Sequence, residues 1–149
     1  MGDYLERKLI FEVDRIVVAD DGTQVMMSWE HPIMKKMAEI AALRGGDILE
    51  IGFGMGISAT EVQRLRPRSH TIVEAHPEIV NRAHRWASER PNATIISGRW
   101  QDRLDQLGEY DGILFDVFGG KGQRCAFFSH LHHLLRPQGT ATLWLADDR

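Results

Sequence analysis

The run Asp47-Ile-Leu-Glu-Ile-Gly-Phe-Gly-Met-Gly56 joins a short apolar stretch to three glycines at alternate positions. Its first part, residues 47–51, is almost continuously apolar, which is typical of a parallel strand that is covered on both faces. Glycine tolerates the positive φ angles of a tight turn, and an amphipathic stretch at residues 58–65 follows the glycines. The run therefore predicts a strand, a tight turn and a helix at the start of a parallel α/β sheet.

Four further apolar runs have the same character and lie at residues 71–74, 94–97, 112–116 and 140–145. Longer amphipathic stretches separate them, with apolar residues at helical spacing over residues 77–90 and 123–135. This alternation of strand and helix predicts right-handed βαβ crossovers. We expect an α/β fold with a doubly wound, mainly parallel, Rossmann-like sheet of five strands in the order 3-2-1-4-5.

Residues 1–46 have a different character and form an N-terminal arm ahead of the core at residues 47–149. Apolar residues 16–19 and 24–27 flank Asp20-Asp21-Gly22-Thr23, which predicts a hairpin with Asp and Gly in its turn. A helix is expected from Pro32, a residue favoured in the first helical turn, to the pair Gly45-Gly46. Such an arm either folds over the sheet as a lid or is a plain packing element, and the sequence favours neither.

The composition limits the fold and the class of partner. A chain of 149 residues with 43% apolar residues can bury one core, so we expect a single domain over residues 1–149. The net charge is -3 and the charges are mixed along the chain, so we expect neither a nucleic-acid partner nor a membrane anchor. The lone Cys125 cannot form an internal disulfide, and no apolar run is as long as a membrane span. We therefore expect a cytoplasmic protein with a small-molecule partner.

The glycine turn has the chemistry of a nucleoside site. In an open parallel sheet, ligands bind beyond the carboxyl ends of the strands, and the first strand-to-helix turn is the usual contact. Gly52, Gly54 and Gly56 would let the backbone approach a ligand closely, and the N–H groups of the next helix could bind a carboxylate. Glu74, at the end of the second core strand, could accept hydrogen bonds from both hydroxyls of a ribose.

The spacing of the glycines separates two classes of nucleoside cofactor. Dinucleotide-binding turns carry G-x-G-x-x-G, which would need glycine at position 57, where this chain has Ile57. The spacing Glu50-x-Gly-x-Gly-x-Gly56 instead resembles motif I of class I S-adenosylmethionine-dependent methyltransferases. The structural alternative for these residues is an ordinary tight turn that caps a helix.

A closer resemblance extends over most of the chain, from Val25 to Ala146. Five runs carry it: Val25-Met-Met-Ser-Trp-Glu-His-Pro-Ile-Met34, Ile48-Leu-Glu-Ile-Gly-Phe-Gly-Met55, Ile72-Val-Glu74, Gly98-Arg-Trp-Gln-Asp102 and Tyr110-Asp-Gly-Ile-Leu-Phe-Asp116. In order and spacing they resemble guanidinoacetate N-methyltransferase and related small-guanidine methyltransferases. The Trp-Glu-x-Pro-x-Met run and the Phe-Asp strand end are more specific than the glycine turn.

The resemblance implies that the chain binds S-adenosyl-L-methionine. The residues that it implies at the cofactor are Glu50, Gly52, Gly54, Gly56, Glu74, Met34, Trp100 and Gln101. Trp100 and Gln101 match the positions beside the adenine, although the family usually carries a glutamate at the second of these. No metal is expected, because His130 and His133 share a predicted helix face but lack a third ligand.

The resemblance also implies that Glu30 and Asp116 grip the guanidinium group of a substrate, and the chemistry supports this pair. A guanidinium is planar, carries only donors and has a pKa above ~12, so it arrives charged. Two carboxylates can fix its plane with charge-assisted hydrogen bonds, and one can take the proton that the nitrogen loses. We assign Asp116 as the general base and Glu30 as the second contact. Each has a structural alternative, because Asp116 could cap the next helix and Glu30 suits a first helical turn.

The family continues beyond the fifth strand, whereas this chain ends at Ala146-Asp-Asp-Arg149. The family binds the carboxylate of its substrate just after the fifth strand, so the resemblance implies that Asp147 and Asp148 would oppose an anionic substrate end and favour a cationic or neutral one. The leading interpretation is an N-methyltransferase that acts on a small guanidine or amine. The alternatives are a cofactor-binding module or weakly active remnant that works with a partner protein, and a small-molecule methyltransferase with an unrelated acceptor.

The last predicted strand would form an open edge of the sheet. An exposed apolar edge strand invites pairing with another strand. A symmetric homodimer is the simplest closed solution, and the N-terminal arm or a partner protein could cover the edge instead.

Overall fold

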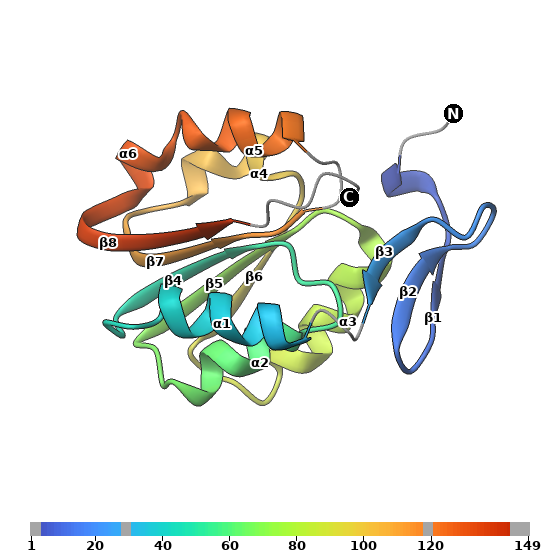
Figure 1. The fold of residues 1–149 in the computed structure, drawn as a ribbon, viewed down its shortest axis with the longest axis horizontal. Helices are drawn as coiled ribbons and strands as arrows, with labels where there is room; N and C mark the ends of the chain where they lie inside the picture. The colour runs from blue at the N-terminus through green and yellow to red at the C-terminus, as the bar shows by residue number, and fades with distance from the viewer. Residues whose placement is uncertain (1–3, 28–30, 118–120, 144–149) are drawn as a thin grey trace.

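A parallel sheet of five strands forms the centre of the protein, and its strands lie in the order β6-β5-β4-β7-β8 (Figure 1). The computed structural model describes residues 4–27, 31–117 and 121–143. The strands of this sheet are β4 (Asp47–Ile51), β5 (Ser69–Glu74), β6 (Ala93–Ser97), β7 (Tyr110–Phe115) and β8 (Leu135–Leu143). All neighbours pair in parallel. The predicted fold class and the predicted order 3-2-1-4-5 are therefore confirmed.

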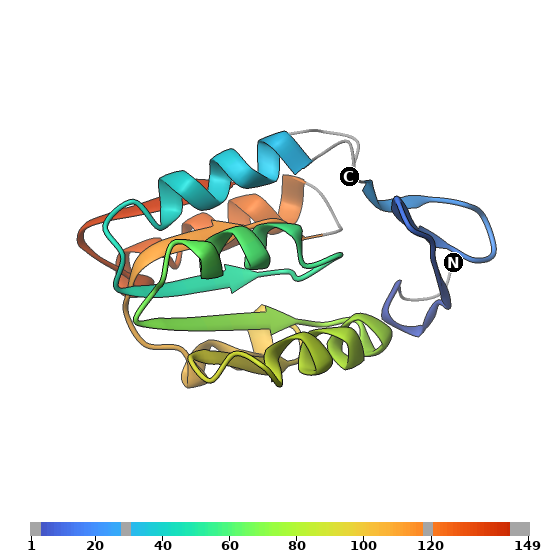
Figure 2. The same ribbon diagram turned by 90° about the horizontal axis from the view of Figure 1, so that it is seen from below.

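Helices cover both faces of the sheet (Figures 1 and 2). One layer holds α1 (His31–Ala41), α2 (Ile57–Arg64) and α3 (Pro77–Ala87). The other holds α4 (Trp100–Arg103), η3 (Leu104–Gln106), α5 (Lys121–Phe128) and α6 (Leu131–Leu134). Successive residues of β4 alternate between the layers, since Ile48 packs with α1 and α2, whereas Leu49 and Ile51 pack with α4 and α5. No helix in the described part of the chain is long and apolar enough to cross a bilayer.

The helix predicted over residues 123–135 is wrong in its extent. The chain forms α5 and α6 instead, with a turn at Ser129 and His130 between them. The Ser129 hydroxyl donates to the carbonyl oxygen of Ala126 at 2.7 Å, a local hydrogen bond that competes with the helical pattern. Leu135 already belongs to β8. Helical spacing of apolar residues continues through this break, so periodicity did not reveal it.

Other predicted boundaries also differ from the structure. The helix α1 ends at Ala41, before the predicted Gly45-Gly46. The helix α3 ends at Ala87, before the predicted residue 90. The strand β8 begins at Leu135, before the predicted residue 140. Its residues 140–143 pair with β7 as predicted, and the remaining predicted strand residues, 144 and 145, lie outside the described residues.

The N-terminal arm forms a separate antiparallel sheet of three strands, preceded by the short helix η1 (Tyr4–Glu6). Its strands are β1 (Leu9–Phe11), β2 (Arg15–Val18) and β3 (Gln24–Met27). The predicted hairpin is the β2–β3 pair, and its turn is stabilised by Asp21, whose carboxylate accepts from the N–H and the hydroxyl of Thr23 at 2.9 and 2.6 Å. The strand β1 was not predicted, because three residues are too few to display a period.

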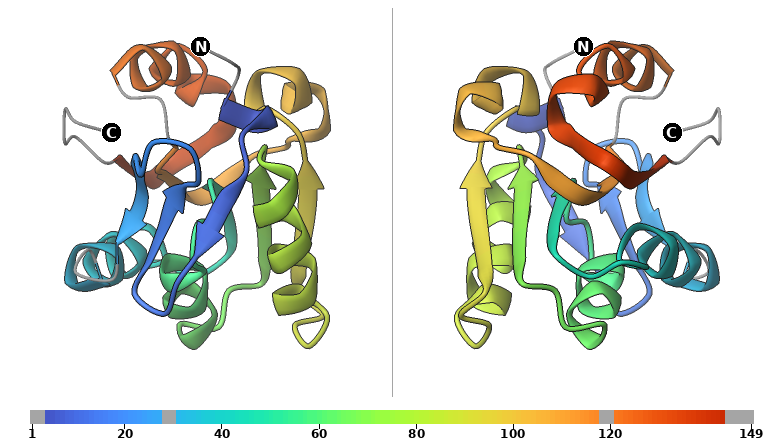
Figure 3. Two further views of the ribbon diagram at one scale, coloured as in Figure 1. Left: turned by 90° about the vertical axis from the view of Figure 1, so that its right-hand side faces the viewer. Right: turned by 90° about the vertical axis from the view of Figure 1, so that its left-hand side faces the viewer.

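This three-stranded sheet lies beyond the carboxyl ends of the parallel strands, next to α3 (Figures 1 and 3). The Leu9 N–H donates to the Glu78 carboxylate at 2.8 Å, and His76 Nε2 hydrogen-bonds the Arg7 carbonyl oxygen at 2.8 Å. The ring of Tyr4 packs on the ring of His76, with centroids 5.0 Å apart. The arm is thus anchored at the start of α3, near the end of the sheet where ligands bind in folds of this class.

The strand β8 is an edge of the described sheet, as predicted. The helix α1 lies beside it, and the Thr142 hydroxyl donates to the Met37 carbonyl oxygen at 3.4 Å. The homodimer through this edge stays a prediction.

An ion-pair network joins the amino ends of four parallel strands. Asp47 accepts from Arg68 and Arg136, each at 2.7 Å, and from the Ser69 hydroxyl at 2.7 Å. Asp111 accepts from Arg136 at 2.8 Å and from the backbone N–H of Asp47 at 2.8 Å. The hydrogen bonds from Arg68, then those from Ser69 and Arg136, hold the pKa of the Asp47 carboxyl well below its usual range. The network therefore stabilises the folded state in a pH-dependent way.

We expect Asp47→Asn to lower the free energy of unfolding at pH 7 by about 1–2 kcal/mol, because it removes charge-assisted hydrogen bonds at a partly exposed site. The folded pKa is lowered, so this contribution is complete above the unfolded pKa of about 3.9 and is lost as pH falls through the folded value. Urea titrations between pH 7 and 3 measure it, with Glu89→Gln on the exposed surface as a charge-matched control. Equal effects of the two substitutions would contradict the prediction.

The turn after β4 packs against the turn after β7 through a glycine. Gly52 has a φ of +95°, and a Cβ atom there would lie 2.1 Å from the backbone carbonyl oxygen of Asp116. The Gly52 N–H donates to Val73 of β5 at 2.8 Å, and the Asp116 N–H donates to Ile51 of β4 at 3.0 Å. No side chain fits at position 52 unless one of these strand ends moves.

Gly52→Ala should lower the free energy of unfolding by more than about 2 kcal/mol, because it combines an unfavourable positive φ with a clash against backbone. Gly108→Ala is the matched control, since a Cβ atom there meets nothing within 4 Å. This control should change stability by less than about 0.5 kcal/mol. Guanidinium chloride unfolding of both variants measures these changes. If Gly52→Ala lowers the free energy of unfolding no more than Gly108→Ala does, the two turns are not tightly packed.

Candidate functional site

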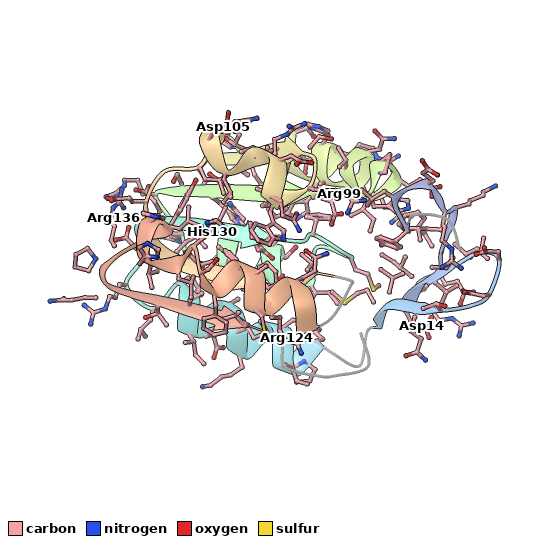
Figure 4. All side chains as sticks on the ribbon, turned by 90° about the horizontal axis from the view of Figure 1, so that it is seen from above. Asp14, Arg99, Asp105, Arg124, His130 and Arg136 are labelled. Atoms are coloured by element: carbon pink, nitrogen blue, oxygen red, sulfur yellow. The ribbon has the colours of Figure 1, made fainter. Side chains whose placement is uncertain are left out.

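A cavity of about 240 Å³ opens at the carboxyl ends of the central strands, between the parallel sheet and the N-terminal arm. The loops after three neighbouring strands contribute Gly52, Phe53 and Gly54 (after β4), Glu74 and Ala75 (at the end of β5), and Asp116 and Val117 (after β7). The start of α4 contributes Trp100 and Gln101, and the arm contributes Tyr4, Leu5, Val25 and Met26. Figure 4 shows Arg99, a lining residue, and Arg136, of the ion-pair network, near opposite ends of the sheet.

The structure brings together six of the ten residues that were predicted for the site. Those that line the cavity are Gly52, Gly54, Glu74, Trp100, Gln101 and Asp116. Three do not line it, namely Glu50, Gly56 and Met34. The tenth, Glu30, lies outside the described residues.

The glycine turn has the backbone conformation that its sequence predicted. Gly54 has a φ of +56°, and a Cβ atom there would lie 2.9 Å from the terminal carbon of Met26 in the arm. Gly56 has a φ of +77° and forms the N-cap of α2, with its Cα packed against the ring of Phe53. Gly56 therefore shapes the turn without reaching the cavity, whereas Gly52 and Gly54 present backbone to it.

Glu74 is buried, and its two carboxylate oxygens hold two loops together. Oε1 accepts from the Phe53 N–H at 2.8 Å, and Oε2 accepts from the His76 N–H at 2.9 Å. Each carboxylate oxygen has a second lone pair, so both remain able to accept a hydrogen bond from a ligand. The carboxylate fixes the glycine turn relative to the start of α3 and also lines the cavity.

Tyr4 covers this part of the cavity from the arm. Burial, and then the nearby carboxylates of Glu74 and Glu78, raise the pKa of its phenol far above the ordinary value. The hydroxyl therefore stays protonated and able to donate at any physiological pH. Its position shows that the arm both packs against the start of α3 and lines the cavity.

Glu50 does not have the position that the prediction gave it. The residue is only 1% exposed, and its side chain faces α2, because alternation along β4 turns Ile51 to the opposite face. Its carboxylate accepts from the Ser58 hydroxyl and binds Nε2 of the fully buried His70 at 2.8 Å. Ser58 lines the cavity, so Glu50 acts on the site by holding a lining residue.

Met34 is also a core residue rather than a lining residue. It is fully buried in the cluster formed by α1, α2 and one face of the sheet. Trp100 is 4% exposed, and its ring contacts Phe115 and Phe127 with centroid distances of 6.0 and 5.2 Å. Most of the Trp100 side chain is therefore buried in the core, and the small part that remains exposed lines the cavity.

Several lining residues were not predicted. They include Tyr4, Leu5, Val25, Met26, Ser58 and Gln123. Ser58 had a usable signal, because it stands two residues beyond Gly56 at the start of a predicted helix. Tyr4 and Gln123 had none, since they reach the cavity only through the folding of distant segments.

The sequence matches a known protein family over most of its length. A family model described as guanidinoacetate N-methyltransferase matches residues 13–143. Proteins named protein arginine N-methyltransferase 2 are also similar. The one from Yarrowia lipolytica is 38% identical over 92% of this chain and 32% of its own length, and the one from Saccharomyces cerevisiae is 36% identical over 91% and 36%. The chain spans about a third of the length of these relatives.

Solved methyltransferase structures share the fold. The O-methyltransferase TomG from Streptomyces achromogenes, in complex with S-adenosylmethionine, has a TM-score of 0.66 and 24% identity over 75% of this chain and 54% of its own. Aeropyrum pernix fibrillarin, with bound S-adenosyl-L-methionine, has a TM-score of 0.62 and 17% identity over 91% and 76%. At these identities they support the fold alone, and the family match carries the assignment. The chain belongs to the guanidinoacetate N-methyltransferase family of class I S-adenosylmethionine-dependent methyltransferases.

Proposed function

We propose that this chain transfers a methyl group from S-adenosylmethionine to a nitrogen of the guanidino group of an arginine side chain in a protein. The observation that carries the proposal is the arrangement of Glu74 and Asp116 around one cavity. Glu74 ends β5 and Asp116 directly follows β7, and these strands flank β4, so about 10 Å of sheet separates a nucleoside carboxylate from an acceptor carboxylate. The family match and the names of the relatives support the same chemistry.

The residues of the cavity fit the cofactor. Gly52 and Gly54 present backbone without side chains, and the buried Glu74 carboxylate keeps two lone pairs that suit the ribose hydroxyls. Trp100 and Gln101 offer an aromatic ring and an amide for the adenine. When bound, S-adenosylmethionine supplies an electrophilic methyl group on its sulfonium.

Asp116 has the acceptor-side role in this proposal. A guanidinium is charged at physiological pH, and the Asp116 carboxylate can accept its N–H groups and fix its plane. The nitrogen that gains the methyl carbon loses one proton, and we expect Asp116 to take it. Glu30, outside the described residues, is proposed as the second carboxylate on the same group.

The choice of a protein arginine over a free guanidine has two supports. The relatives are named as protein arginine methyltransferases. The sequence also carries Asp147 and Asp148, which lie outside the described residues, and two negative charges close to the acceptor would oppose the carboxylate of a free amino-acid-like substrate. An arginine within a polypeptide has no such carboxylate.

A second candidate is a cofactor-binding domain whose acceptor site is completed by another polypeptide segment. The observation that favours it is that the chain spans about a third of the length of its relatives. This candidate keeps the cofactor cavity and requires a partner for methyl transfer.

Two measurements on the 149-residue chain test the proposal. Calorimetric titration with S-adenosylhomocysteine should give one site per chain. Mass spectrometry should then detect methylation of arginine in a peptide, and little or none of guanidinoacetate, free arginine or an alkylamine. Binding without transfer to any acceptor would favour the second candidate, and absence of binding would refute both.

Glu74→Gln and Asp116→Asn should separate cofactor binding from transfer. Glu74→Gln replaces one acceptor oxygen by a donor, so S-adenosylhomocysteine affinity should fall about ten-fold or more. Asp116→Asn should leave that affinity within about two-fold and lower the transfer rate at least about a hundred-fold, the usual range for a general base. Calorimetry and single-turnover assays measure the two effects. A large loss of S-adenosylhomocysteine affinity in Asp116→Asn, with the fold intact, would show that Asp116 contacts the cofactor, which would contradict its assignment to the acceptor.

A further inference from the structure

Three side chains at the start of α4 and α5 share one oxygen atom. Gln123 Oε1 accepts from Trp100 Nε1 at 2.8 Å and from Gln101 Nε2 at 3.1 Å. All three residues line the cavity. The position of the Trp100 ring is also fixed by contacts with the rings of Phe115, Phe127 and His130.

The indole determines the orientation of both amides. An indole N–H can only donate, so the Gln123 atom that faces it must be the oxygen. The same oxygen faces Gln101, so the Gln101 atom that faces it must be the nitrogen. The terminal torsion of a glutamine is soft and allows two opposite amide orientations, but here a rigid donor selects one of them.

This locked orientation gives Gln101 the character of an acceptor. With Nε2 turned to Gln123, Oε1 is the part of the Gln101 amide that can accept from a ligand in the cavity. An unlocked glutamine would be able to donate or accept. A glutamate at this position would need no lock, because an ionised carboxylate can only accept.

We propose that Gln123 is a specificity-determining positioning residue that locks Gln101 as a hydrogen-bond acceptor and thereby selects a 6-aminopurine over a 6-oxopurine nucleoside. The inference rests on the proposed function, in which the cavity holds the nucleoside of the cofactor with its adenine beside Trp100 and Gln101. The exocyclic amino group of adenine donates to Gln101 Oε1. The 6-oxygen of hypoxanthine would face it as a second acceptor, which leaves both groups unpaired and raises the free energy of binding.

The test is calorimetric titration of the full chain with S-adenosylhomocysteine and with its inosine counterpart, S-inosylhomocysteine. The wild-type protein should prefer the adenine compound about ten-fold or more, the value for one mispaired hydrogen-bonding position. Gln123→Met removes the acceptor at similar size, and the preference should fall below about three-fold. Gln123→Glu keeps an acceptor for both donors and should keep the preference.

A double variant separates the lock from a merely structural role of Gln123. Gln101→Glu combined with Gln123→Met places an acceptor that needs no lock, so the preference should return to about the wild-type value. A structural role would leave this double variant as impaired as Gln123→Met alone. Gln106→Met, on the exposed surface of η3, is the matched control and should change nothing.

The outcomes divide cleanly. If the wild-type protein binds neither compound, the proposed function fails and the inference fails with it. If it binds both equally, or if Gln123→Met keeps the full preference, the inference alone is refuted. Circular dichroism confirms that each variant is folded, and Gln123→Ala replaces Gln123→Met if the latter is not.

Discussion

The backbone of Gly52 lies between the ends of two strands, and the rest of the site depends on this contact. Its N–H donates to Val73 at the end of β5, and its Cα packs against the carbonyl of Asp116 after β7. Because no side chain separates these loops, the loops after β4, β5 and β7 converge on one cavity. The Glu74 carboxylate stabilises this arrangement, because it accepts hydrogen bonds from the backbone of the glycine turn and of the loop before α3. A close backbone approach therefore explains how Glu74 and Asp116 come to line one cavity.

The amino ends of the parallel strands carry an ion-pair network, and their carboxyl ends line the cavity. At the amino ends, the carboxylates of Asp47 and Asp111 accept hydrogen bonds from arginine side chains, and Asp111 also accepts from a backbone N–H. Neither residue lines the cavity. At the carboxyl ends, Glu74 contributes to folding and also faces the cavity. Glu50 stands between these cases, since it is buried beneath the turn and reaches the cavity only through Ser58. Carboxylates that look alike in the sequence thus have three different roles.

The strands and the glycine turn could be predicted from the sequence because their signals are local, and the strand order was predicted from the fold class that they indicate. Apolar runs mark the buried strands, and glycines with positive φ mark the turn. Other features depend on contacts between distant segments and left no local signal. The break at Ser129 accompanies one side-chain hydrogen bond. The layer that Glu50 faces depends on which helices pack on each side of β4. Gln123 is remote in sequence from Trp100, and only the packing of α5 beside α4 gives it a role.

The central claim is that the cofactor binds at the carboxyl ends of β4 and β5. Hydrogen exchange followed by mass spectrometry, with and without S-adenosylhomocysteine, tests it most directly because it locates the ligand on the backbone. The account predicts slower exchange in residues 51–56, 74–76 and 98–101, and unchanged exchange at the amino ends, in residues 66–69 and 136–139. Protection at the amino ends, or no protection at saturating ligand, would contradict it.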